Sequence, residues 1–217
     1  VVDINGENAA AVAGELGCVA MTADVSVEAD IARVIDETET TIGPIDLFCS
    51  NAGVGLGESP ASPNTEWQLS WDVNVMPHVY AARYLVPRMV ARGGGYLLNT
   101  ASAAGLLSQI GGAAYAVTKH AAVGFAEWLA IHHAHEGIKV SLLCPQAVRT
   151  PMTESDNEGV AAASVDGMME PEDLAEIVVA GLRAERFLIL THEEVLEYMR
   201  RKTSDYDRWV GGMNRFM

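Results

Sequence analysis

The 217-residue sequence has few cysteines, few basic residues and no long apolar run. Its three cysteines, Cys18, Cys49 and Cys144, are far apart and form no CxxC pair, so the sequence indicates neither a disulfide framework nor a zinc site. We therefore expect small buried thiols and no bound metal. Cytoplasmic redox conditions fit this cysteine content, so the expected localisation is cytoplasmic.

Basic residues number 14 against 29 acidic ones, which gives a formal net charge of −15. This charge would repel a polyanion, so nucleic acid is not an expected partner. The longest nearly uncharged stretch, residues 96–117, is interrupted by polar residues and glycines, and no segment stays apolar for the thickness of a bilayer. Because no secretory segment is visible either, we expect no membrane partner.

Short apolar segments alternate with helix-forming segments along the chain. The segments expected to form strands are residues 1–3, 18–22, 45–50, 96–100, 138–143 and 187–190. The segments expected to form helices are residues 6–16, a helix capped by Ser26, and residues 65–91, 113–135 and 171–184. Strands that are apolar throughout indicate a parallel sheet covered on both faces. The predicted fold is therefore α/β, a three-layer, doubly wound, Rossmann-like sheet.

We expect this fold to form a single domain over residues 1–217. Within it, residues 153–170 are predicted to be an irregular substrate lid, and residues 191–217 a helical tail whose charged side chains face solvent. The first strand of such a sheet, with the glycine-rich turn that receives a pyrophosphate, has no match in the sequence. Deleting a central strand would leave unpaired backbone groups on its neighbours, so we expect further residues before Val1 in the natural protein.

Tyr115 and Lys119 lie four positions apart at the start of an expected helix, which puts the phenol and the ammonium on one helical face. A cation beside a phenol lowers the phenol pKa, so the phenolate can accept an alcohol proton. Many surface helices carry this spacing by chance. Ser102 follows an expected strand, where a hydroxyl can donate to a substrate oxygen. A turn serine that bonds its own backbone is the alternative.

With these residues in place, the sequence resembles the short-chain dehydrogenases/reductases with subunits of about 250 residues. Asn51, Ala52 and Gly53 match the family's Asn-Ala-Gly motif, which stabilises the sheet and borders the adenosine. The segment from Pro145 to Thr150 matches a second motif, in which Val148 and Thr150 correspond to positions that meet the nicotinamide carboxamide.

The resemblance also implies a catalytic tetrad, Asn74, Ser102, Tyr115 and Lys119. In it, Tyr115 exchanges the substrate proton, Lys119 bonds the nicotinamide ribose, Ser102 orients the substrate oxygen, and Asn74 keeps a water in place for proton relay. Gln146 stands where the family has glycine, and this change removes a φ-permissive residue and could reshape the substrate pocket.

The expected cofactor is NAD, with NADP less favoured. Asp3 ends the first expected strand, where an acid accepts hydrogen bonds from the adenosine ribose and would repel a 2′-phosphate. Asp24 matches the family position that contacts the adenine amino group, and Val25 would pack on the ring. An ordinary aspartate leading into a helix is the alternative for Asp24.

The substrate residues are expected to be Ala104, Gln109, Gln146 and Met152, with alanines and methionines of the lid, a mixture that suits an apolar alcohol or ketone. The acidic residues Glu154, Asp156 and Glu158 lie on the lid without a basic cluster, which disfavours acyl-carrier and coenzyme A substrates. A solvated mobile loop is the alternative interpretation of this segment.

The sequence therefore predicts an NAD-dependent oxidoreductase that interconverts an apolar secondary alcohol and its ketone. The alternative is a non-catalytic dinucleotide sensor or scaffold on the same fold. Family resemblance implies a homotetramer or homodimer, built partly from the two long helices at residues 65–91 and 113–135. His132, His133 and His135 are interpreted as histidines that complement a helix dipole rather than as metal ligands.

Overall fold

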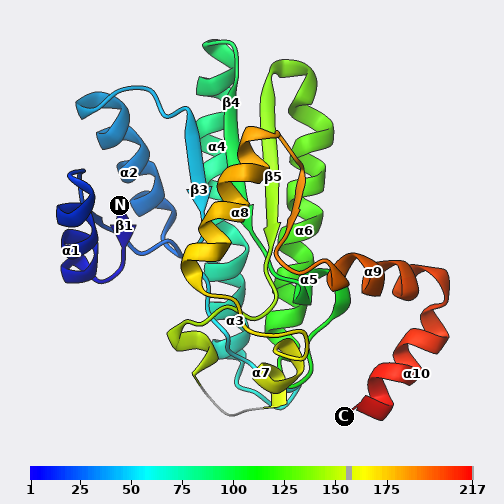
Figure 1. Cartoon of the computed structure of the whole chain (residues 1–217). Helices are drawn as coiled ribbons and strands as arrows, with labels where there is room; N and C mark the ends of the chain where they lie inside the picture. The colour runs from blue at the N-terminus through cyan, green and yellow to red at the C-terminus, as the bar shows by residue number, and fades with distance from the viewer. Residues whose placement is uncertain (155–157, 217) are drawn as a thin grey trace.

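The structure, a computed structural model, describes residues 1–154 and 158–216 (Figure 1). Asp156 of the predicted lid lies outside the described residues. The strands are β1 Val2–Asp3, β2 Met21–Thr22, β3 Leu47–Ser50, β4 Gly95–Thr100, β5 Ile138–Cys144 and β6 Leu188–Leu190. The larger helices are α1 Gly6–Leu16, α2 Glu28–Thr41, α3 Asn64–Asn74, α4 Met76–Ala91, α6 Ala113–His133, α8 Pro171–Arg183, α9 Glu194–Ser204 and α10 Tyr206–Phe216. The short helical segments are α5 Ala104–Leu107, η1 Ala134–Glu136, η2 Pro151–Thr153 and α7 Glu158–Ala163.

All strand pairs in the described residues are parallel, in the order β3-β4-β5-β6 with a separate pair β1-β2. Neighbouring strand residues point to opposite faces. Leu97 and Leu142 belong to the core shared with α4 and α6, whereas Leu98 and Leu143 pack with α8 on the other face. Figure 1 shows α8 in front of the sheet, and α4 and α6 behind it. The predicted three-layer α/β fold is confirmed.

The sheet is divided between β1 and β3, which share no hydrogen-bonded register in the part of the chain that the structure describes. Apolar side chains are unusually exposed on these two strands: Val2 is 41% exposed and Leu47 is 42% exposed. A strand inserted here would give both of them a neighbour. The expectation of a further strand at this position stays a prediction.

Several predicted boundaries are wrong for identifiable reasons. The helix expected over residues 65–91 is two helices, which meet at Val75. Pro77, which has no N–H to donate, falls in the first turn of the second helix, a position that tolerates proline. Ser26 does not cap α2, because its hydroxyl donates to Asp24 and Val27 is the N-cap residue without a side-chain bond. The irregular lid contains the short helix α7.

The expectation of buried thiols holds only for Cys144. Cys18 and Cys49 are exposed, and all three cysteines are free. Cys49 lies on β3, the strand at the divided edge of the sheet. No helix among the described residues is long and apolar enough to cross a membrane.

Loops that meet at the carboxyl ends of the strands fix the start of α6. The backbone N–H of Ala113 donates to the Glu58 carbonyl (3.2 Å) and that of Ala114 to the Gly57 carbonyl (2.9 Å). The chain after β4 is tied to the chain after β5 by a bond from Ala103 N–H to the Pro145 carbonyl (2.8 Å). These bonds satisfy donors that a helix start leaves free and align α6 with the sheet edge.

Helix α5 packs against the backbone of α6 at Gly105. A Cβ at this position would lie 2.5 Å from the Lys119 carbonyl oxygen, a contact too close to keep. At Gly124, on α6 itself, a Cβ would have no neighbouring atom within 4 Å. The two glycines therefore differ in packing although both are helical.

We expect Gly105→Ala to lower the free energy of unfolding by about 1–3 kcal/mol, because the added methyl group overpacks the contact between α5 and α6. Gly124→Ala, the matched control, should leave stability unchanged or raise it by up to ~1 kcal/mol, since alanine has the higher helix propensity. Urea denaturation of both variants checks this. Equal stability of the two would contradict the packing argument.

Candidate active site

Tyr115 and Lys119 lie one turn apart on α6, with the Lys119 Nζ 5.6 Å from the centre of the Tyr115 ring. Lys119 is 3% exposed, and its ammonium donates to the Thr100 carbonyl at the end of β4 (3.2 Å). Among the described residues this is its one hydrogen-bond acceptor, so N–H donors remain for a ligand. The structure therefore brings the two groups together as the spacing predicts.

Ser102 lies in the turn that follows β4 and is 8% exposed. Its Oγ accepts from the Ala104 N–H (3.1 Å) and donates to the Pro145 carbonyl (3.4 Å). The alternative of a turn serine bonded to backbone thus describes part of its environment. Ser102 also interacts with the Tyr115 side chain, where it favours the ionised phenol and so lowers the Tyr115 pKa. The three groups share one site.

Burial acts on both ionisable groups of this site. Burial raises the pKa of Tyr115, and the interaction with the Ser102 side chain offsets this only in part. Burial lowers the pKa of Lys119 to about 8. The phenol pKa is therefore shifted in the direction opposite to the predicted one, because loss of solvent outweighs stabilisation of the phenolate by its neighbours.

Asn74, at the end of α3, joins two other parts of the site. Its Oδ1 accepts from the Val54 N–H (2.8 Å), and its Nδ2 donates to the Val54 carbonyl (2.9 Å) and to the Thr118 hydroxyl (3.1 Å). The side chain is fully buried and engaged by protein at both ends. It therefore fixes the loop after β3 against α6, next to Lys119.

The Asn-Ala-Gly motif follows β3 directly, with Asn51 and Ala52 exposed. A Cβ on Gly53 would lie 3.2 Å from the Asn74 Oδ1 and 3.3 Å from the Lys119 Nζ. Glycine therefore lets the loop backbone approach the ammonium closely. This contact explains one role of the motif that the sequence did not reveal.

The segment from Pro145 to Thr150 is held by local bonds. Val148 forms an isolated bridge with Met169, and its carbonyl accepts from the Thr153 hydroxyl (2.6 Å). Thr150 is the N-cap residue of η2, in a capping box with Thr153. The two positions matched to the carboxamide contact are thus on a braced loop beyond β5.

The residues predicted to face the adenosine are near the β1-β2 pair. Asp3 is exposed, and its Oδ1 accepts from the Asn5 N–H (2.8 Å). The Oδ1 of Asp24 accepts from both the backbone and the hydroxyl of Ser26 (2.9 and 2.7 Å). That geometry is what an aspartate leading into a helix makes. Val25 is partly buried against the main core.

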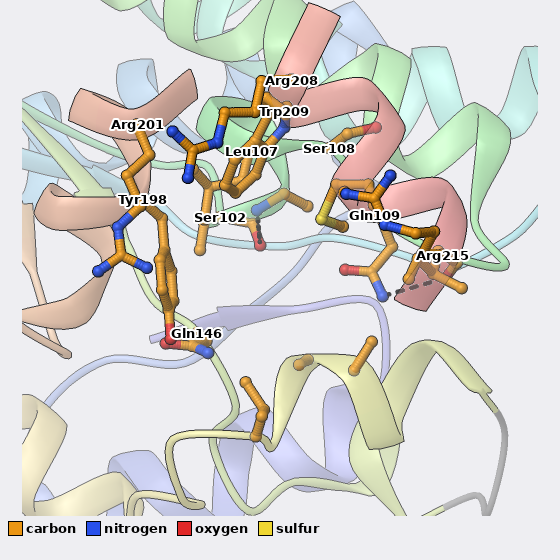
Figure 2. Close-up of a pocket in the computed structure, with 18 of the residues that line it drawn as sticks. Ser102, Leu107, Ser108, Gln109, Gln146, Tyr198, Arg201, Arg208, Trp209 and Arg215 are labelled. Atoms are coloured by element: carbon orange, nitrogen blue, oxygen red, sulfur yellow. Dashed lines mark hydrogen bonds between the residues drawn. The ribbon is translucent and has the colours of Figure 1, made fainter. Parts of the chain in front are cut away.

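A cavity of about 760 Å³ begins at Ser102 (Figure 2). Of the predicted substrate residues, Ala104, Gln109 and Gln146 line it. Met152 lies elsewhere, with its Cγ 3.8 Å from the Cβ position of Gly55. The lid contributes Ala162, Ala163 and Val165 to the walls.

Two glutamines brace the lid over this cavity. Gln109 Nε2 donates to the Gly159 carbonyl of α7 (2.8 Å), and Gln146 Nε2 donates to Asp166 (2.9 Å). Asp166 also accepts from the Tyr198 hydroxyl of α9 (2.9 Å). The Oε1 of Gln146 is buried without a partner in the described residues, which leaves an acceptor for a ligand.

The C-terminal helices supply walls that the sequence analysis missed. Tyr198, Arg201, Arg208, Trp209 and Arg215 line the cavity, although the charged side chains of the tail were predicted to face solvent. The sequence shows that the three arginines are charged, but it does not show that they line a cavity. Their placement depends on the turn at Asp205, between α9 and α10, which no strong local signal marks.

His78 is a second feature that the sequence analysis missed. It lies on α4, 3% exposed, beside the Asn99 side chain and the Asn74 backbone, and its Nδ1 has no partner in the described residues. Burial, helped by the charge on Lys119, lowers the pKa of His78 from 6.5 to about 3. The imidazole is therefore neutral under ordinary conditions.

Because protons bind His78 more weakly in the folded than in the unfolded chain, its contribution to stability is fully present above pH 6.5 and falls as the pH drops toward about 3. The loss is about 1.4 kcal/mol per pH unit in this window. Replacement of His78 by leucine should remove this slope. His132→Leu, at an exposed histidine, is the control.

Urea denaturation between pH 7 and pH 5 measures the effect. The wild-type protein and His132→Leu should lose about 2 kcal/mol more stability over this range than His78→Leu. Parallel pH dependence in all three proteins would show that His78 is solvated and titrates normally.

Known proteins share both the sequence and the fold of this chain. A family model described as short chain dehydrogenase matches residues 1–161. The 1-deoxy-11-beta-hydroxypentalenate dehydrogenase of Streptomyces exfoliatus is 34% identical over 198 residues, which cover 88% of this chain and 70% of that protein. The cyclohexanol dehydrogenase of Acinetobacter sp. (strain SE19) is 30% identical, over 82% of this chain and 74% of its own length.

Solved structures agree with the sequence relatives. A short chain dehydrogenase/reductase from Burkholderia phymatum, crystallised in complex with NAD, superposes with a TM-score of 0.85 at 28% identity. The superposition covers 95% of this chain and 84% of that one. Since the family model matches well over half of the residues, the chain belongs to the short-chain dehydrogenase family of oxidoreductases.

Proposed function

We propose that the protein is an NAD-dependent dehydrogenase that interconverts a secondary alcohol and its ketone, with Tyr115 as the acid/base. The observation that carries the proposal is the shared position of the Tyr115 phenol, the buried Lys119 ammonium and the Ser102 hydroxyl, with Ser102 lining a cavity large enough for a small molecule.

In the oxidising direction the alcohol O–H proton passes to the Tyr115 phenolate while the C–H hydrogen leaves with its electron pair as hydride. NAD, when bound, would supply the hydride acceptor. Ser102 would donate its hydroxyl hydrogen to the substrate oxygen in place of the Pro145 carbonyl, which accepts it over 3.4 Å in this structure. Asn74 acts as a positioning residue, which holds Val54 and Thr118 around Lys119.

The residues present fit such a cofactor at its nicotinamide end. Lys119 has spare N–H donors, which suit ribose hydroxyls. They lie beside Gly53, where a Cβ would crowd the ammonium. Val148 and Thr150 lie on the braced loop that would meet the carboxamide. At the other end, Asn51, Ala52, Asp24 and Val25 would border the adenosine.

Asp3 supports NAD rather than NADP as the cofactor. Its carboxylate is exposed and uses one oxygen for Asn5, so the other oxygen remains for a ribose hydroxyl. A 2′-phosphate at that place would meet like charge. The related structure from Burkholderia phymatum was solved with NAD.

The names of the relatives support an alcohol as substrate. One relative is named for cyclohexanol and another for a hydroxypentalenate. Ala104, Gln109 and Gln146 would contact the substrate, with the unpartnered Gln146 Oε1 as an acceptor. We also propose a cytoplasmic homotetramer or homodimer, as the family resemblance implies.

Replacement of Tyr115 by phenylalanine should lower kcat by at least about 10²-fold, because the proton acceptor is lost, while NAD binding is largely kept. NAD reduction, followed by the absorbance of the reduced cofactor with a panel of secondary alcohols that includes cyclohexanol, measures this. The same assay with NADP should give slower turnover.

Tyr84→Phe is the matched control, since this phenol bonds Glu28 away from the site. It should retain wild-type activity. Normal turnover by Tyr115→Phe would rule out Tyr115 as the acid/base, and equal loss in both variants would point to folding rather than chemistry.

A further inference from the structure

The cavity that begins at Ser102 has a cationic wall. Arg201 on α9, and Arg208 and Arg215 on α10, line it together (Figure 2). The whole chain has 14 basic residues against 29 acidic ones, so three guanidinium groups around one cavity oppose the overall charge. An anion that approaches this acidic protein is attracted to the cavity and not to the protein surface as a whole.

The three arginines differ in their partners. Arg201 pairs with Glu197 (3.0 Å) and stacks over the Tyr198 ring, 5.9 Å from its centre. Arg208 and Arg215 have no carboxylate within 4.0 Å among the described residues. Both are exposed on the cavity side of α10, so their charge is available to a ligand.

Helix α9, which carries Arg201 and precedes Arg208 and Arg215, is fixed over the cavity. Lys202 donates to the Leu106 carbonyl of α5 (2.6 Å), and Tyr198 donates to Asp166, which also binds Gln146. Helix α9 is therefore connected through hydrogen bonds to α5 and to the loop that follows β5. Such a wall can place one end of a ligand while Ser102 meets the other.

The remaining walls are largely apolar. Leu107, Ile110, Val165, Trp209 and Met213 line the same space. A ligand that fills it needs an apolar skeleton, and the guanidinium groups add a requirement for negative charge. A carboxylate meets that requirement, because guanidinium binds it, as it does a phosphate, with two parallel hydrogen bonds.

We propose that Arg208 and Arg215 bind an anionic group of the substrate, so that the substrate class is a hydroxy or oxo acid with an apolar skeleton. This inference rests on the proposed function only for the end of the substrate that reacts beside Ser102 and Tyr115. It narrows the apolar alcohol or ketone predicted from sequence, which took no account of the C-terminal helices.

Two fluorescent probes with the same rings test the anion site without any turnover. They are 8-anilino-1-naphthalenesulfonate, an anion, and N-phenyl-1-naphthylamine, its neutral counterpart. Fluorescence titration of the intact protein gives both dissociation constants. In Arg208→Gln/Arg215→Gln, the constant for the anion should rise about tenfold, since charge-assisted bonds are lost, while that for the neutral probe stays within about twofold.

Arg200→Gln is the matched control, because it removes one arginine from α9 without touching the cavity walls. Both probes should bind it as they bind the wild type. The proposal is overturned if the anionic probe binds the double variant as it binds the wild type, or if Arg200→Gln weakens the binding of the anionic probe as much as the double variant does. It is also overturned if the double variant weakens the binding of both probes equally.

Tyr115→Phe separates this proposal from the proposed reaction. It should bind both probes as the wild type does, because the arginines and not the phenol hold the anion. Loss of anion selectivity in the arginine variant with an inactive Tyr115→Phe would support both proposals. Unchanged anion binding in the arginine variant would rule out the proposed anion site without contradicting the proposed role of Tyr115.

Discussion

The site depends on a lysine ammonium that is buried beside a phenol without a carboxylate partner in the described residues. Burial of an unpaired charge is costly, and the structure reduces this cost in two ways. The Thr100 carbonyl accepts one hydrogen bond, and the pKa of Lys119 falls to about 8. The same desolvation raises the pKa of Tyr115. Both groups are therefore less charged here than in water, and a ligand that supplies acceptors for Lys119 would restore its ionised form.

Packing around this pair comes from segments far apart in the chain. Gly53 after β3, Asn74 at the end of α3 and Thr118 on α6 meet around the ammonium. The carboxyl ends of β4 and β5 are linked through the Pro145 carbonyl, which places Ser102 near the phenol. Because each contact joins two elements, the geometry of the site is a property of the sheet edge rather than of one motif.

Local periodicity predicted the layers and the proximity of Tyr115 and Lys119, whereas their catalytic roles come from the family resemblance and stay predictions. Apolar strands that alternate with helices imply a covered parallel sheet, and a spacing of four brings Tyr115 and Lys119 together. What it could not predict depends on tertiary contacts. Desolvation reverses the expected shift of the phenol pKa, and His78 has no local signal of burial. The arginines on α10 line the cavity only because the chain turns at Asp205, and charge alone suggested a solvated helix face.

Tyr115 and Lys119 are proposed to act together on one bound nicotinamide. Ultraviolet difference titration of the phenol absorbance, with and without saturating NAD, measures tyrosine ionisation directly. We predict that NAD lowers the pH at which one tyrosine ionises, and that this shift disappears in Tyr115→Phe and is reduced in Lys119→Met. A titration that NAD leaves unchanged, or a shift that persists in Tyr115→Phe, would contradict the account.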